Sequence, residues 1–233
     1  MESNYFYDLF STKGIEYVLV IMFLISFVMF FRYLEKPARL TARVSIPAAI
    51  ESTLINWFQI LENYFYHPGH CWVKVESGNV VSIGIDDFAS KLLGTPNKIN
   101  LPRLGENIAQ GEMGMSMEID GKRIDLLTPV NGEVVEINQD AVDNPDLFSR
   151  RTDESDSWLF KVRVPKLKAN LVNLLSGDLA KAWMEEVSHK LSRLTTGDLG
   201  FALQDGGQLK DGFSKEISPE NWDELAKEFL LTK

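Results

Sequence analysis

The stretch from residue 112 to residue 138 constrains the fold of this chain more than any other. Apolar residues alternate with polar or small ones from Met113 to Ile119. A period of two predicts a half-buried β-strand. Asp120-Gly121 follows, and a glycine that accepts positive φ suits a tight hairpin turn. The rest of the stretch predicts a strand, a turn and a further strand, at residues 122–128, 129–132 and 134–137.

Composition narrows the class of protein. The chain has 233 residues, which suits one good-sized domain with appendages or two small domains. Its formal net charge is −9, and no lysine- or arginine-rich patch offsets this charge, so a nucleic-acid partner is not expected. The single cysteine, Cys71, excludes an internal disulfide.

An apolar run near the N-terminus predicts a membrane anchor. Residues 17–31 contain no charge, and Ser26 is their one polar residue apart from Tyr17. Extended to 14–34, the run reaches about 20 residues, enough to span a ~30 Å hydrocarbon core. A cleaved signal peptide needs a basic start and a small-residue cleavage site, and the chain offers neither. A buried soluble helix is the remaining alternative. We therefore expect a retained transmembrane helix over 14–34.

Basic residues after this run predict its orientation. The positive-inside rule places them in the cytoplasm, with residues 1–13 outside and the main domain inside. The protein is thus expected to be single-pass in the inner (cytoplasmic) membrane, where the same cations could touch anionic headgroups. These basic residues are Arg32, Lys36, Arg39 and Arg43.

The juxtamembrane region, residues 35–66, predicts a linker and then a helix. Pro37 ends the apolar helix, and the linker runs to about Pro47. Ile50, Leu54 and Leu61 recur at helical spacing, which indicates an amphipathic helix. Its polar face is acidic, so packing on the following domain is favoured over the bilayer surface.

The central region predicts short strands around one helix. Strands are expected over residues 72–75 and 80–85, joined by a turn at Ser77-Gly78-Asn79. Asp86 is expected to cap a helix that runs through Leu93.

Ordered motifs in this region resemble the H-protein of the glycine cleavage system. The resemblance implies an α+β fold: a lipoyl-type barrel-sandwich hybrid β domain with flanking helices, over residues 67–194. The matching residues are His70, Trp72, Val73, the segment 81–89, Leu93-Gly94, Leu101-Pro102, Gly105, the segment 129–138, the segment 144–147 and the segment 158–161.

The resemblance also implies where a lipoyl group would be attached. In that family the modified lysine lies at the hairpin tip, eight positions before the proline of the following turn. Gly121 lies eight positions before Pro129, and Lys122 is one residue further on. Glu118 matches the family's glutamate three positions before the lysine. A shift of one residue moves a side chain to the opposite face of a strand, so a degenerate carrier site without a cofactor is expected. The alternative is lipoate on Lys122.

Other chemistry is not expected. His67, His70 and Cys71 lack a fourth partner and fall short of a zinc site, and the resemblance makes His70 a strand-edge residue. The methionine row at 113, 115 and 117 is interpreted as core. No nucleophile–base pair or cofactor loop is visible in the sequence, so the protein is not expected to be an enzyme.

The C-terminal part predicts helices that need a surface to cover. A helix is expected over 168–194, and the alternative is two helices divided at Gly177-Asp178. The extension, 195–233, predicts a hairpin at about 201–209 and a last helix capped by Ser218. Trp222 and Phe229 on its apolar face would be covered by the central domain or by a partner subunit.

Together these features predict a membrane-anchored, non-catalytic and non-lipoylated accessory subunit. It would act as a scaffold or docking element of a membrane-bound redox or respiratory complex. Its partners would be integral and peripheral protein subunits and the lipid bilayer. The alternative is an active membrane-tethered lipoyl carrier that uses Lys122.

Overall fold

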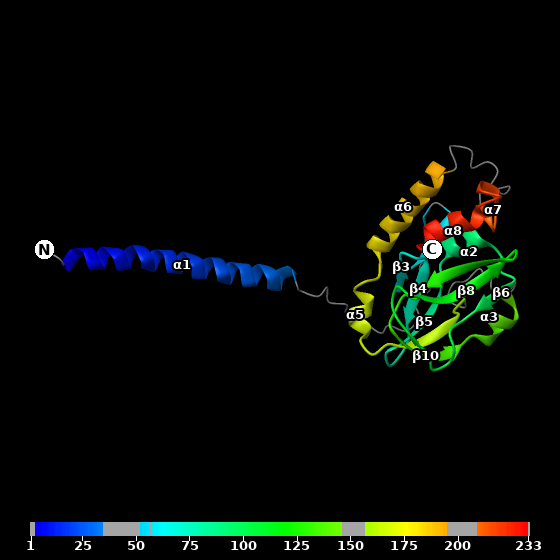
Figure 1. Cartoon of the computed structure of the whole chain (residues 1–233), viewed down its shortest axis with the longest axis horizontal. Helices are drawn as coiled ribbons and strands as arrows, with labels where there is room; N and C mark the ends of the chain where they lie inside the picture. The colour runs from blue at the N-terminus through cyan, green and yellow to red at the C-terminus, as the bar shows by residue number, and fades with distance from the viewer. Residues whose placement is uncertain (1–2, 35–51, 56, 146–156, 195–208, 233) are drawn as a thin grey trace. The chain divides into compact units, whose positions relative to one another are not determined.

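The computed structural model describes residues 3–34, 52–55, 57–145, 157–194 and 209–232 (Figure 1). The chain divides into two compact units, residues 1–48 and 49–233. The first unit contains helix α1, Ser3–Leu34.

Helix α1 contains the predicted apolar run and begins earlier than expected. Its large apolar side chains from Tyr17 to Phe30 are exposed on every side, at 68% and 56% for these two residues. Within the part of the chain that was described, no helix has the length and hydropathy of a membrane span. Of the four residues predicted to set orientation, Lys36, Arg39 and Arg43 lie outside the described residues, as does the side chain of Arg32.

The second unit is built on a six-stranded antiparallel sheet in the order β3-β4-β5-β11-β10-β7. A three-stranded sheet in the order β6-β8-β9 contributes to the same core, and β1 pairs with β2. The strands are β1 Ser52–Ile55, β2 Phe58–Leu61, β3 Tyr64–His67, β4 Cys71–Val75, β5 Val80–Ile85, β6 Lys98–Asn100, β7 Asn107–Ile108, β8 Met113–Ile119, β9 Lys122–Leu127, β10 Gly132–Ile137 and β11 Phe160–Arg163.

Helices flank these sheets (Figure 1). They are α2 Asp87–Leu93, α3 Gln139–Asp143, α5 Leu167–Leu171, α6 Asp178–Leu194, α7 Phe213–Ile217 and α8 Trp222–Leu230. Asp86 caps α2 as predicted, with Oδ1 accepting from the Ala89 N–H at 2.8 Å. The predicted C-terminal helix is present as two, α5 and α6, and the break falls before Asp178.

One core joins the two larger sheets. Trp72 and Ile83 from the six-stranded sheet and Met117 from the three-stranded sheet are all at most 1% exposed. Met115 is 4% exposed, whereas Met113 at the strand end is 63% exposed. The interpretation of the methionine row as core therefore holds for two of its three members.

The prediction of an amphipathic helix after Pro47 is wrong. Ser52–Ile55 and Phe58–Leu61 form strands β1 and β2, with Leu54 paired to Gln59. The apolar spacing fitted a helix, but Phe58 and Ile60 are buried while Gln59 is only half-buried, which is a period of two. Pairing of β1 with β2 satisfies the backbone hydrogen-bonding groups here. Residue propensity alone does not decide between helix and strand in so short a segment.

The prediction that Ser218 caps the last helix is also wrong. A turn occupies residues 219–221, and α8 begins at Trp222 with Asn221 at its N-cap position. The predicted hairpin at 201–209 lies outside the described residues except for Leu209. Trp222 and Phe229 are 5% and 4% exposed because they pack into the core of the central domain. Of the two surfaces considered, the central domain is therefore the one that covers them.

Candidate functional site

The β8–β9 hairpin has the predicted two-residue turn. Asp120 and Gly121 have φ values of 49° and 76°, and Ile119 pairs with Lys122 across them. Positive φ at both central positions is the geometry of a type I′ turn, which matches the right-handed twist of the two strands. The tip is therefore fixed in register, and Lys122 is the first residue of the returning strand.

Gly121 and Lys122 have different surroundings. A Cβ added at Gly121 would meet no atom within 4 Å, so this position is open. The Lys122 amine instead donates to Asp223 Oδ1, and it lies 3.3 Å from the Glu220 carbonyl oxygen. The same amine is 5.5 Å from the centroid of the Trp222 ring. A lysine amine has three N–H donors, and here two acceptors and an aromatic ring surround it.

A second lysine joins the C-terminal helices to the turn. Lys215 of α7 donates to Asp120 Oδ2 and lies 5.3 Å from the centroid of the Trp222 ring. We call Lys215, Glu220, Trp222 and Asp223 the tip cap. Its contacts to residues 120 and 122 bridge about a hundred positions of sequence.

Electrostatic interactions at the hairpin tip favour the charged form of Asp223. The hydrogen bond from Lys122 lowers the pKa of Asp223 below its ordinary value, against a smaller opposing effect of burial. The Lys122 side chain remains 38% exposed, so solvent screens this ion pair in part.

Glu118, the third residue of the predicted degenerate carrier site, points to different partners. Its Oε1 accepts from Asn100 Nδ2 at 3.1 Å and lies 3.7 Å from Lys98 Nζ. The structure thus brings Gly121 and Lys122 together at the turn, while Glu118 contacts the neighbouring strand β6.

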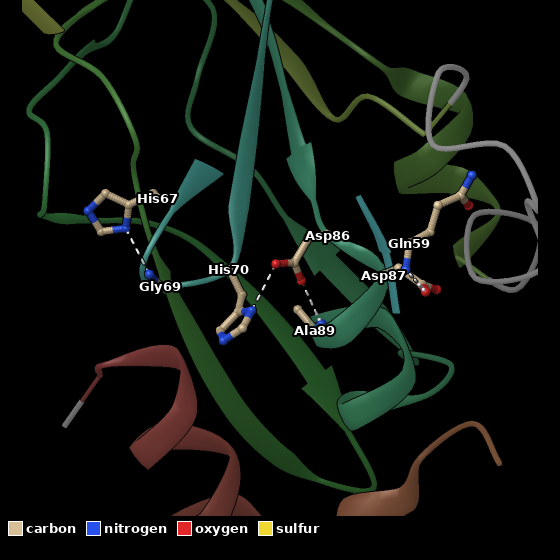
Figure 2. A network of polar contacts seen from close by, with 7 residues as sticks. All are labelled: Gln59, His67, Gly69, His70, Asp86, Asp87 and Ala89. Carbon is tan, nitrogen blue, oxygen red and sulfur yellow. Dashed lines mark hydrogen bonds and ion pairs between the residues drawn. The ribbon is translucent and has the colours of Figure 1, made fainter. Parts of the chain in front are cut away.

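A buried polar network lies where β4, β5 and α2 meet (Figure 2). His70 and Asp86 are 1% and 0% exposed, and His70 Nδ1 lies 2.8 Å from Asp86 Oδ2. The other oxygen of Asp86 accepts from Ala89, so one carboxylate joins the β3–β4 turn to the start of α2. The His70 ring also stacks on Phe88, with centroids 4.3 Å apart. These contacts make His70 a structural residue inside a turn, where it has a φ of 63°.

His67 and Cys71 do not join this network as ligands. His67 Nδ1 accepts from the Gly69 N–H at 3.0 Å, and Figure 2 shows its ring directed away from His70. Burial, and secondarily the charge of His70, lowers the pKa of His67. Cys71 is fully buried, and burial strongly raises the pKa of its thiol. Among the residues that the structure describes, no group of three or more His, Cys, Asp or Glu could hold a metal ion.

Next to this network, Asp87 ties strand β2 to helix α2. Its Oδ2 accepts from the Gln59 N–H at 2.9 Å and from Lys91 Nζ at 2.8 Å. Burial raises the pKa of Asp87, and the neighbouring Lys91 opposes that rise.

Sequence reasoning identified the hairpin but missed the tip cap. The spacing of Trp222 and Phe229 indicated a face in need of cover, yet nothing local paired Asp223 with Lys122 or Lys215 with Asp120. These pairs join positions 101 and 95 residues apart.

The fold and the hairpin define a protein of the lipoyl-carrier architecture, with two sheets, flanking helices and a tight β-hairpin. The glycine cleavage H-protein family matches residues 64–187, which is more than half of the chain. The chain belongs to this family.

Two curated relatives agree with the family match. The chain is 35% identical over 127 residues to glycine cleavage system H protein 1 of Caldanaerobacter subterraneus subsp. tengcongensis, covering 54% of this chain and 98% of the relative. It is 36% identical over 128 residues to the H protein of a Thermoanaerobacter species, covering 55% and 98%. A solved H protein from Mycobacterium marinum is similar at a TM-score of 0.48 and 26% identity, over 55% of this chain and 99% of that one.

Proposed function

We propose that this protein is a non-lipoylated H-protein-like accessory subunit, anchored in a membrane by α1, that serves as a scaffold or docking element of a membrane-bound redox or respiratory complex. The observation that carries the proposal is the environment of the hairpin tip. The open position is a glycine, and the adjacent lysine amine is engaged by Asp223 and Glu220.

The tip geometry explains why a shift of one residue matters. A swinging lipoyl arm needs an amine that a modifying enzyme can reach and that can then move between partners. At Gly121 the space beyond the backbone is open, but there is no side chain. At Lys122 the side chain is present, but its amine is in contact with α8. Modification of Lys122 would convert a charged amine into an amide and would remove its ion pair with Asp223.

Membrane anchoring is supported by the surface of α1. Its apolar side chains from Tyr17 to Phe30 are exposed all around the helix. A helical segment that is apolar on every side, as this one is, requires an apolar environment, either lipid or protein. Attachment of the N-terminal helix to lipid would hold the H-protein-like unit at a membrane surface, where it could contact integral and peripheral subunits.

The second candidate is an active lipoyl carrier, and family membership favours it. The relatives named above are glycine cleavage system H proteins. In this version Lys122 would be released from Asp223 and acylated.

Intact-mass measurement separates the two candidates. The full chain is co-expressed with a lipoate–protein ligase and lipoate, alongside an H protein of a relative as positive control. We expect no adduct on the wild-type chain. Gly121→Lys is the matched variant: it places an amine in the open position, at a cost of about 1–2 kcal/mol for a side chain at positive φ. We expect this variant to gain one lipoyl group. A lipoyl adduct on Lys122 of the wild-type chain would refute the proposal.

Vesicle flotation tests the anchor. The full chain, mixed with liposomes during synthesis, should float with the lipid and resist extraction by carbonate. A chain in which Leu19, Leu24 and Phe27 are changed to Ser should remain in the soluble fraction. Equal flotation of the two chains would contradict a hydrophobic anchor.

A further inference from the structure

Helices α7 and α8 of the C-terminal extension contact the hairpin tip, which a swinging-arm carrier would present to other proteins. The family match ends at residue 187, whereas α7 and α8 follow it, at Phe213–Ile217 and Trp222–Leu230. These helices therefore add a feature to the family's domain. In Figure 1, α7 and α8 lie beside α2 on the central domain.

The contacts at the tip are chemically specific. Each cation of one element meets an acid of the other: Lys122 of β9 donates to Asp223 of α8, and Lys215 of α7 donates to Asp120 of the turn. Two reciprocal ion pairs fix both the position and the orientation of α7 and α8 on the hairpin tip, whereas a single pair would fix only the position. Trp222 lies within cation–π distance of both lysine amines.

Burial behind the tip holds the extension in place. Phe213 and Leu230 are fully buried, and Phe88 of α2 contacts both Phe213 and Phe229, with ring centroids 5.9 and 5.1 Å apart. Ser214 Oγ donates to the Leu92 carbonyl oxygen at 2.6 Å, in a buried position. The ion pairs at the tip thus lie at the edge of a packed interface. Helices α7 and α8 share their buried side chains with the domain core, so these two helices are not a loosely attached tail.

We infer that helices α7 and α8 act in cis as a cap on one side of the hairpin tip. They use Lys122 as an anchoring cation, so that its amine is closed to other proteins, whereas the space beyond Gly121 stays open. The inference rests on the proposed function, because both require that the Lys122 amine carries no lipoyl group. It assigns a role to α7 and α8, and it directs any docking of partner subunits away from the side of the tip that these two helices contact.

Zero-length cross-linking of the full chain in mild detergent tests the cap directly. A carbodiimide joins an amine to a carboxylate only when the two are in contact. Peptide mass spectrometry should find amides between Lys122 and Asp223 and between Lys215 and Asp120, both in monomeric protein. Asp223→Asn should lose the first and keep the second. Glu224→Gln removes an exposed carboxylate from the next position of α8 and should keep both.

Amine reactivity gives a second measurement. The rate of acetylation of Lys122 is compared with that of Lys98, whose side chain is 61% exposed. In Asp223→Asn the relative rate at Lys122 should rise by about two- to fivefold, the range expected for a partly exposed ion pair. In Glu224→Gln it should stay at the wild-type value.

Several outcomes would overturn the inference that α7 and α8 act as a cap. These are the absence of both cross-links, their occurrence only between two copies of the chain, or equal Lys122 reactivity in the two variants. Failure of the proposed function has a different signature. Lipoate on wild-type Lys122 would refute the non-carrier role, whereas the Lys215–Asp120 cross-link would still report whether the extension covers the turn.

Discussion

Replacing Asp86 with alanine should destabilise the central domain more than most single changes, because one buried carboxylate satisfies two donors. Its Oδ1 accepts from the Ala89 N–H at the start of α2, and its Oδ2 pairs with His70 Nδ1, both at 2.8 Å. Loss of an N-cap side chain costs about 0.5–2 kcal/mol. A buried donor left without a partner costs a further ~1–3 kcal/mol. The free energy of unfolding should therefore fall by about 1.5–5 kcal/mol in total.

Asp86→Ser is the matched variant for this prediction. A serine can still cap the helix, but its shorter side chain does not reach His70, so only the second loss of about 1–3 kcal/mol is expected. The assay is urea unfolding of the full chain in mild detergent, followed by tryptophan fluorescence. A loss below about 0.5 kcal/mol in Asp86→Ala, the range of an ordinary surface change, would refute the reasoning. Equal losses in the two variants would show that capping contributes nothing.

Three further predictions follow from burial, charge and backbone contact. Cys71 should resist maleimide in the native protein and react on unfolding, because it is fully buried and burial raises the pKa of its thiol; rapid native labelling by intact mass would contradict this. The pKa of Asp223 is lower in the folded state, so its contribution to stability is present above the unfolded pKa and is lost as pH falls through the folded pKa. The difference in unfolding free energy between wild type and Asp223→Asn should accordingly vanish in strong acid, and a pH-independent difference would disprove the linkage. Gly132→Ala places a Cβ 2.3 Å from the Arg163 carbonyl oxygen and should cost about 1–3 kcal/mol in thermal unfolding, whereas Gly121→Ala meets open space and should cost only the ~1–2 kcal/mol of positive φ. A loss below about 1 kcal/mol in Gly132→Ala would argue against crowding at Gly132.

Elements with a local cause were predictable from the sequence. The alternation from Met113 to Ile119 and the Asp120-Gly121 turn fixed the hairpin and its register, because strand period and positive φ are properties of adjacent residues. Asp86 before an apolar segment predicted the start of α2 for the same reason.

Elements with distant partners were not predictable. The segment 52–61 fitted helical spacing, but its strands are completed from outside: the Gln59 N–H donates to Asp87 and the Leu61 N–H donates to the Tyr66 hydroxyl. The start of α8 was placed at Ser218 by a local capping pattern, whereas the helix begins at Trp222, the residue that packs beside the hairpin tip. In both places tertiary contacts outweighed a weak local preference.

The hairpin, the family and a lysine one residue away from where a carrier would have it all follow from the order of the residues. What that lysine contacts depends on the packing of segments that are distant in the chain. The partner of Lys122 is Asp223, 101 residues further along the chain, and no periodicity or local motif links the two positions. Their meeting depends on how α7 and α8 pack on α2, because burial of Phe213 and Phe229 against Phe88 brings Asp223 to the hairpin tip.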